Sequence, residues 1–231
     1  MADAVQSRPA LTGGRLSQLQ GTIRDWSQGC SPPLPCRLRG SGFADATATV
    51  VPVAEELPQP LITEARIAER VEQLAAEISE EYAAVDEIFL IGVLRGAFIF
   101  LADLSRQLTI PRRVDFIAVS SYGQSDRHSG AVRLVMDVRT SLEGRHVLIV
   151  EDIVDTGLTL EYLKQLLGAR GAASIKTCAL VRKPTRHRVP VDIDYLGFEI
   201  DDVWVVGYGL DYADRYRTLP YIGIVEPDVS G

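Results

Sequence analysis

Three carboxylates follow an apolar run in the segment VLIVEDIVDTGLT, residues 147–159. The run ends at Val150, and Glu151, Asp152 and Asp155 come after it. One acid at such a place could simply cap the next helix, as acids often do. Three acids in this order, after an apolar run typical of a buried strand, indicate a site where carboxylates bind hydroxyl donors, hold a metal ion or accept a proton.

The same segment ends in a turn suited to one phosphate. Gly157 allows close backbone approach, and the helix expected from Leu158 presents free N–H groups and the positive end of its dipole. Thr156 and Thr159 add hydroxyl donors. Two like charges 4 Å apart repel by about 4 kcal/mol at an effective dielectric constant near 20, so acids facing the phosphate would expel it. A sugar phosphate resolves the conflict, because its ribose hydroxyls can donate to the first two acids while the third faces C1.

Strands and helices alternate along the rest of the chain from about Val50 onward. Apolar residues at helical spacing predict a helix that begins after Thr63 as N-cap, and continuous apolar runs are typical of strands buried on both faces. Helices are expected at 63–82, 97–108 and 158–168, and strands at 87–94, 113–121, 132–137, 146–151, 175–182 and 191–199. The alternation predicts an α/β fold with a mostly parallel, twisted sheet flanked by helices. Sites in such sheets lie at the carboxyl ends of the strands, where the acids fall.

Residues 1–48 differ in composition from the rest. They contain scattered Ser, Gly and Pro, and they contain Arg but no Lys or Glu. We expect a disordered N-terminal extension, followed by one domain over residues 49–231. Two alternatives stay open: an organelle-targeting peptide, since such peptides are rich in Arg and Ser and poor in acids, and a start codon assigned upstream of the true one.

The composition limits the possible partners. The formal net charge of −7 is unfavourable for a nucleic-acid surface, which needs a basic footprint. No apolar run approaches the roughly 18 residues of a membrane helix, and the three cysteines make neither a disulfide framework nor a common zinc spacing. We therefore expect a cytoplasmic protein that binds neither nucleic acid nor a membrane.

Four separated motifs resemble the type I phosphoribosyltransferases, and specifically the hypoxanthine/guanine branch of that family. The motifs are LIGVLRGAFIFLADL (90–104), VDFIAVSSYG (114–123), VLIVEDIVDTGLT (147–159) and LGFEIDDVWVVGYGLDYADRYRTLPYIG (196–223). The third motif alone would indicate only the superfamily, whereas the fourth is specific to the branch. The resemblance implies the family's fold, which adds a small hood subdomain and a flexible lid loop to the main sheet.

The resemblance implies roles for the acids and the turn. Glu151 and Asp152 would hold the 2′ and 3′ hydroxyls of the ribose. Asp155 would be the catalytic residue, which takes or shares the proton on purine N7 while N9 attacks C1. The backbone that binds the 5′-phosphate would be that of Asp155, Thr156, Gly157, Leu158 and Thr159.

Two more segments acquire roles from the resemblance. Leu94, Arg95 and Gly96 match the loop that holds pyrophosphate, where the family often has a cis peptide and many relatives have Lys in place of Arg95. Ser121 and Tyr122 begin the stretch SSYGQSDRHSG, which by itself is typical of a mobile surface loop. In the family this stretch is the lid that excludes water during the reaction.

The remaining roles concern the purine and the leaving group. Lys183 alone would be interpreted as a solvated loop lysine; the resemblance makes it a donor to the purine 6-oxo group that rejects adenine. Trp204 would stack on the base, although an isolated Trp is more often core, and Val205 would offer backbone groups to the purine edge. At the purine end, Asp211 would be a ligand of a second Mg²⁺, and Arg217 would contact pyrophosphate. Alone, their stretch could be a charged surface turn.

The implied reaction is the Mg²⁺-dependent transfer of 5-phosphoribosyl from phosphoribosyl pyrophosphate to N9 of hypoxanthine, and of guanine, in purine salvage. IMP or GMP and pyrophosphate would be the products, and Glu151, Asp152 and Asp211 would be the metal ligands. The family generally forms homodimers or homotetramers. Two alternatives stay open: a transferase that prefers xanthine or guanine, and an RNA-binding regulator on the same fold.

Overall fold

The computed structural model describes residues 57–121, 132–186 and 188–226, which fall within one compact unit, Ala54–Gly231. The extension 1–48, Tyr122 of the expected lid and the side chain of Ser121 lie outside the described residues. The expectations about them therefore stay predictions.

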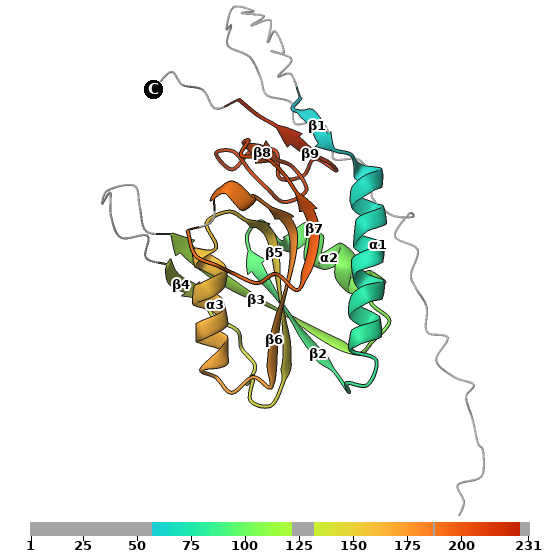
Figure 1. Cartoon of the computed structure of the whole chain (residues 1–231), viewed down its shortest axis with the longest axis vertical. Helices are drawn as coiled ribbons and strands as arrows, with labels where there is room; N and C mark the ends of the chain where they lie inside the picture. Colours follow the sequence, from blue (N-terminus) through green and yellow to red (C-terminus); the bar gives the residue numbers. More distant parts are fainter. Residues whose placement is uncertain (1–56, 122–131, 187, 227–231) are drawn as a thin grey trace, which may run out of the picture. The chain divides into compact units, whose positions relative to one another are not determined.

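Six strands form the central sheet, in the order β4-β3-β2-β5-β6-β7. Neighbouring strands are parallel except for β3 and β4, which are antiparallel. The strands are β2 (Ile88–Leu94), β3 (Arg112–Ser121), β4 (Val132–Met136), β5 (His146–Val154), β6 (Ser174–Arg182) and β7 (Tyr195–Glu199). The predicted mostly parallel sheet is confirmed, and the carboxyl ends of β2, β5 and β6 lie at the same edge (Figure 1).

Helices cover both faces of this sheet (Figure 1). The helices are α1 (Glu64–Glu81) and α2 (Phe98–Gln107) on one face and α3 (Leu158–Gly168) on the other, and the short 3-10 helix η1 (Pro184–Arg186) follows β6. Helix α1 begins as predicted, because the Thr63 hydroxyl accepts the main-chain N–H of Arg66 at 3.4 Å.

Strand β5 lacks polar alternation because both of its faces are buried. Leu148 and Val150 pack in the core cluster that contains α1 and α2, while Val147 and Ile149 pack in the cluster that contains α3. All four side chains are fully buried. A strand buried in this way is a rigid support for Glu151 and Asp152 near its carboxyl end and for Asp155 just after it.

A second, three-stranded antiparallel sheet has the order β1-β9-β8 and corresponds to the expected hood. Its strands are β1 (Gln59–Ile62), β8 (Val205–Val206) and β9 (Ile222–Ile224). The strand expected from residue 191 was wrong at its start, since β7 begins only at Tyr195. Val191 and Ile193 instead pack against the core on the α3 side outside any strand, so burial alone accounts for their apolar character.

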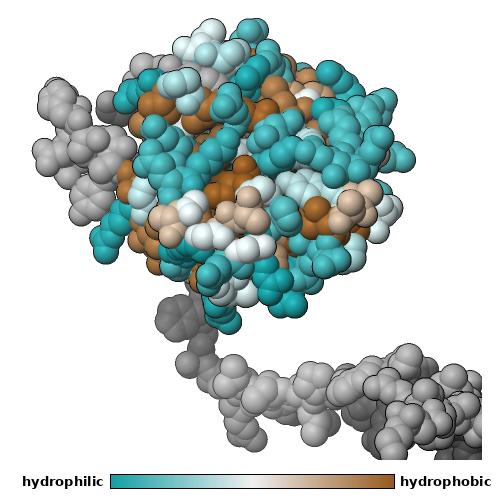
Figure 2. All heavy atoms as spheres, turned by 60° about the horizontal axis from the view of Figure 1, so that its bottom comes forward, coloured by the Kyte–Doolittle hydropathy of each residue, from teal (hydrophilic) through white to brown (hydrophobic). Residues whose placement is uncertain are grey.

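Polar side chains cover most of the face in Figure 2, and apolar side chains appear there in small groups between them. Large apolar side chains that are exposed include Phe98, Val114, Met136 and Trp204. Within the described parts of the chain, no helix has both the length and the apolar character that a bilayer crossing needs.

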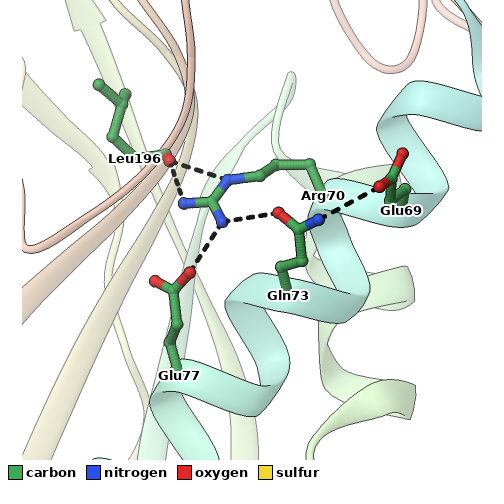
Figure 3. Close-up of polar contacts among 5 residues, drawn as sticks. All are labelled: Glu69, Arg70, Gln73, Glu77 and Leu196. Carbon is green, nitrogen blue, oxygen red and sulfur yellow. Dashed lines mark hydrogen bonds and ion pairs between the residues drawn. The ribbon is translucent and has the colours of Figure 1, made fainter.

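Arg70 connects α1 to the outermost strand, β7 (Figure 3). Its Nε and Nη2 donate to the carbonyl oxygen of Leu196 at 3.2 and 2.8 Å. Its Nη1 donates to Gln73 at 3.1 Å and to Glu77 at 2.8 Å. One planar guanidinium therefore satisfies a carbonyl of β7 and holds the helix against the sheet.

We expect Arg70→Ala to lower the free energy of unfolding by about 1–3 kcal/mol, because it leaves a half-buried carbonyl without its donor. Arg70→Lys should recover only part of the loss, since an ammonium cannot reproduce the paired donors of the fork. Urea unfolding monitored by circular dichroism measures both variants. An Ala variant within about 0.5 kcal/mol of wild type would contradict this role of Arg70.

Candidate active site

Glu151 and Asp152 form an adjacent pair of acids at the carboxyl end of β5. Glu151 is 5% exposed. Burial and the neighbouring charge of Asp152 raise the pKa of Glu151 well above its usual value. Burial also raises the pKa of Asp152 to about 6, although the main-chain N–H groups of Asp152 and Ile153 and the charge of Arg217 oppose the shift. A cation or the hydroxyl donors of a ligand would stabilise such a pair in its ionised form.

The raised pKa of Asp152 predicts a pH-dependent stability. Between about pH 4 and pH 6 the folded chain holds a proton here that the unfolded chain has lost. The free energy of unfolding therefore falls as pH rises through about 6. Asp152→Asn should raise the Tm of the ligand-free protein by roughly 3–8 °C at pH 7.5 and by clearly less at pH 5.

Differential scanning calorimetry at the two pH values tests this prediction, with exposed Asp201→Asn as the charge-matched control. A lower Tm for the Asp152 variant at both pH values would contradict it.

The loop after β2 packs tightly against Asp152. The peptide bond between Leu94 and Arg95 is cis, as the resemblance implied. A Cβ on Gly96 would lie 1.6 Å from Oδ2 of Asp152, and a Cβ on Gly209 would lie 1.9 Å from the carbonyl oxygen of Gly96. Two glycines thus allow three distant segments of the chain to meet.

The turn over residues 155–159 has the geometry expected of a phosphate site. Gly157 has φ 83°, in the left-handed region that favours glycine, and a Cβ there would approach a methyl of Val191 to 3.0 Å. Helix α3 begins at the next residue, and its N-cap residue, Gly157, has no side chain to cap it. The N–H groups of its first turn are therefore available to an anion.

Asp155 and Lys183 follow the neighbouring strands β5 and β6, and the Lys183 N–H donates to the Val154 carbonyl at 3.0 Å. Nε of Arg186 lies 2.9 Å from Oδ1 of Asp155 but without hydrogen-bond geometry, so this buried oxygen has no hydrogen bond within the described residues. Oδ1 of Asp202 lies 3.3 Å from Nη1 of Arg186 and 3.8 Å from Nζ of Lys183. Lys183 is only 6% exposed. A buried acceptor without a hydrogen-bond donor and a buried lysine, at the ends of neighbouring strands, indicate a binding site for a polar molecule.

The segment after β7 supplies an aromatic ring and an ion pair. Trp204 is 53% exposed, and the edge of its ring system meets Tyr212 with centroids 6.1 Å apart, so it is a surface aromatic and not a core side chain. Oδ1 of Asp211 lies 2.7 Å from Nη2 of Arg217. Val205 is buried and opens β8.

Sequence reasoning missed three charged residues that contact the predicted ones. Arg186 contacts Asp155, Asp202 lies between two cations, and Asp214 pairs with Arg95 at 2.9 Å. Each belongs to a loop rich in charges, where the order of residues does not indicate which partner each will find. The signal that could have found them is their place in the segments that follow β6, β7 and β8.

The predicted metal ligands do not form one cluster. Among the described residues, no group of three His, Cys, Asp or Glu side chains is placed to hold a metal ion. Both oxygens of Asp211 are engaged, Oδ1 by Arg217 and Oδ2 by the Asp214 N–H at 2.8 Å. Mg²⁺ in proteins is usually held by one or two carboxylates together with substrate phosphates and water. The acid pair on β5 and Asp211 are therefore two separate candidate anchors.

Comparison with known proteins decides the family. The model of the phosphoribosyl transferase domain matches residues 62–213, about two thirds of the chain. The chain belongs to the phosphoribosyltransferase family. The matched segment contains the turn, the acid pair and the loop after β2, while Arg217 and Asp214 lie just beyond it.

Similar proteins place this phosphoribosyltransferase in the hypoxanthine/guanine branch. The hypoxanthine-guanine phosphoribosyltransferase of Bacillus subtilis is 47% identical over 174 residues, which are 75% of this chain and 96% of that protein. The hypoxanthine phosphoribosyltransferase of Salmonella typhimurium is 45% identical over 166 residues, 71% and 93% of the two chains. A crystal structure of a hypoxanthine-guanine phosphoribosyltransferase from Bacillus anthracis matches with a TM-score of 0.70 at 40% identity, and the match covers 74% of this chain and all of that one. The resemblance drawn from the four motifs is confirmed.

Proposed function

We propose that this phosphoribosyltransferase acts in purine salvage, where it transfers 5-phosphoribosyl from phosphoribosyl pyrophosphate to N9 of hypoxanthine and of guanine. The observation that carries the proposal is that a buried acceptor, Oδ1 of Asp155, and a buried lysine, Lys183, lie at the ends of neighbouring strands. On one edge of a 6-oxopurine, N7 can carry a proton next to the acceptor O6. The Asp155 acceptor complements the N7 proton, and the cationic donor of Lys183 complements O6.

The same pair accounts for the choice of purine. Lys183 donates to the 6-oxo group, and adenine has at that position an amino group, which is itself a donor. Trp204 stacks on the base, and Val205 offers main-chain groups to it. Since the C2 substituent decides between hypoxanthine, guanine and xanthine, a transferase that prefers xanthine or guanine is the nearest alternative.

The donor occupies the remaining groups. Its 5′-phosphate binds the main-chain N–H groups of the turn 155–159, where Gly157, the N-cap residue of α3, has no side chain to cap it. Its ribose hydroxyls donate to Glu151 and Asp152, whose raised pKa values indicate a need for such partners. Arg95 and Arg217 contact the pyrophosphate, and the stretch that begins at Ser121 and Tyr122 closes over both substrates and excludes water.

Glu151 and Asp152 at one place, and Asp211 at another, would hold Mg²⁺ by their carboxylates. When bound, the ion neutralises charge that develops on the leaving pyrophosphate. The fit rests on two neighbouring carboxyl groups, Glu151 and Asp152, whose pKa values are raised and whose ionised forms a divalent cation would stabilise.

Transfer is a displacement at C1 of the ribose. The lone pair of purine N9 forms the N9–C1 bond, the bond between C1 and the pyrophosphate oxygen breaks, and pyrophosphate leaves with that electron pair. The proton on N7 moves to Asp155 or is shared with it, so the purine becomes a better nucleophile as the bond forms. The two bound substrates are held in line for the attack, which provides much of the remaining acceleration.

We also propose a cytoplasmic homodimer or homotetramer with no nucleic-acid partner. The net charge of −7 supports the last point, because an RNA-binding regulator on this fold needs a basic face.

A substrate panel tests the proposed function. Pyrophosphate release is measured with hypoxanthine, guanine, xanthine and adenine, each with Mg²⁺ and with a chelator, and a gel shift with RNA is run on the same preparation. We expect release with hypoxanthine and guanine only when Mg²⁺ is present, little release with adenine, and no RNA shift. An RNA shift without any pyrophosphate release would overturn the proposal.

A further inference from the structure

Asp214 bridges the two cations assigned to pyrophosphate. Its Oδ1 lies 2.9 Å from Nη2 of Arg95 and 3.2 Å from Nη2 of Arg217. Arg95 comes from the loop after β2, and Arg217 from the segment before β9, so one carboxylate oxygen connects two distant parts of the chain. In addition, Nη1 of Arg217 donates to the Gly209 carbonyl at 2.8 Å, so its guanidinium is held in place.

The backbone holds Asp214 in this position. Its N–H donates to Oδ2 of Asp211 at 2.8 Å, and its φ of 62° lies in the left-handed region, as does that of Ala213 at 51°. Tyr212 and Arg215 close the turn with main-chain hydrogen bonds in both directions, at 3.3 and 3.0 Å. A turn with two left-handed residues other than glycine costs free energy, which indicates that the surrounding contacts determine where this carboxylate lies.

We propose that the Asp214 carboxylate occupies these two cations when no pyrophosphate is bound, and that it thereby sets the affinity of the site for pyrophosphate. This inference rests on the proposed function, in which Arg95 and Arg217 contact the pyrophosphate group of the donor substrate and the pyrophosphate product. A ligand that takes these cations must displace Asp214 from both of them and compete with Asp211, whose Oδ1 lies 2.7 Å from Nη2 of Arg217. The ligand then lies close to the negative charge of Asp214, which remains on the turn. Asp214 therefore weakens the binding of pyrophosphate and speeds its release after transfer.

Asp214→Asn is the informative variant, because Asn keeps the side-chain shape and tolerates left-handed backbone. We expect the inhibition constant of pyrophosphate and the KM of phosphoribosyl pyrophosphate to fall by roughly two- to fivefold, because the Arg95 and Asp214 side chains are largely exposed to solvent. The KM of hypoxanthine should stay the same, and kcat should stay the same or fall as release becomes slower. Asp214→Gly, which also removes the charge and accepts this backbone, should change both constants in the same direction.

The charge-matched control is Asp86→Asn, an exposed residue before the amino end of β2 and so at the opposite end of the parallel sheet. Calorimetric titration of pyrophosphate with Mg²⁺ into wild type and variants gives the same comparison without turnover. It therefore tests Asp214 even if the substrate panel were to reject the proposed reaction. Pyrophosphate binding that is unchanged or weaker in both Asp214 variants would overturn the inference.

Discussion

Replacing Asp155 with Asn is expected to lower kcat by about 10²–10⁴-fold and to leave the KM of phosphoribosyl pyrophosphate nearly unchanged. The amide has the same shape, and it can accept a hydrogen bond from N7 but cannot take the proton. The turn proposed to hold the 5′-phosphate offers main-chain N–H groups, so we expect the variant to keep the donor site. Steady-state kinetics with hypoxanthine and with guanine measure both constants.

Asp86→Asn serves as the control, because it removes one carboxylate away from the carboxyl ends of the strands. Calorimetry with phosphoribosyl pyrophosphate and Mg²⁺ should give similar dissociation constants for wild type and the Asp155 variant. Turnover by the Asp155 variant within about threefold of wild type would remove this residue from the catalytic role.

Gly96→Ala is expected to lower kcat/KM for phosphoribosyl pyrophosphate by about 10²-fold or more. The new Cβ would lie 1.6 Å from Oδ2 of Asp152, so either the loop after β2 or the buried acid must move. A shift of about 1 Å in groups that position a substrate can cost about that factor. The same clash should also lower Tm, since Asp152 lies in a tightly packed region.

Gly168→Ala is the matched control. This glycine is the last residue of α3, and its added Cβ would meet only the end of the Ile175 side chain, at 3.8 Å. The control should keep wild-type kinetics and gain a little stability, because Ala has a higher helix propensity than Gly. If Gly96→Ala behaved like this control, the packing of the loop against Asp152 would not matter for donor binding.

Local patterns predicted most of the fold. The periodic apolar face of α1, its Thr63 cap and the apolar run of β5 each depend on residues close in sequence, so they can be recognised without the tertiary structure. Strands β1, β8 and β9 were not predicted, because these short segments become strands only by pairing in the second sheet, where β1 and β9 come from opposite ends of the domain. The start of β7 was wrong because burial outside the sheet makes residues 191–194 look like part of a strand.

The part of the candidate site that depends on residues close in sequence could also be predicted, whereas contacts between distant segments could not. The acids and the turn lie close together in sequence, at the end of one strand and directly after it, so their order alone indicates a sugar-phosphate site. Contacts such as Arg186 with Asp155 and Asp214 with Arg95 form between loops of different strands, and no local pattern specifies them. The division of roles among Lys183, Trp204 and Arg217 came from family resemblance, since each alone is compatible with an ordinary surface or core residue.

The central claim is that the turn 155–159 binds the 5′-phosphate while Glu151 and Asp152 hold the ribose. A crystal structure of the protein soaked with IMP tests it most directly. The account predicts the phosphate on the main-chain N–H groups of the turn, both ribose hydroxyls on the acid pair, and the purine between Lys183 and Trp204. A nucleotide bound with its phosphate outside the turn, or with the acid pair directed away from the ribose, would contradict it.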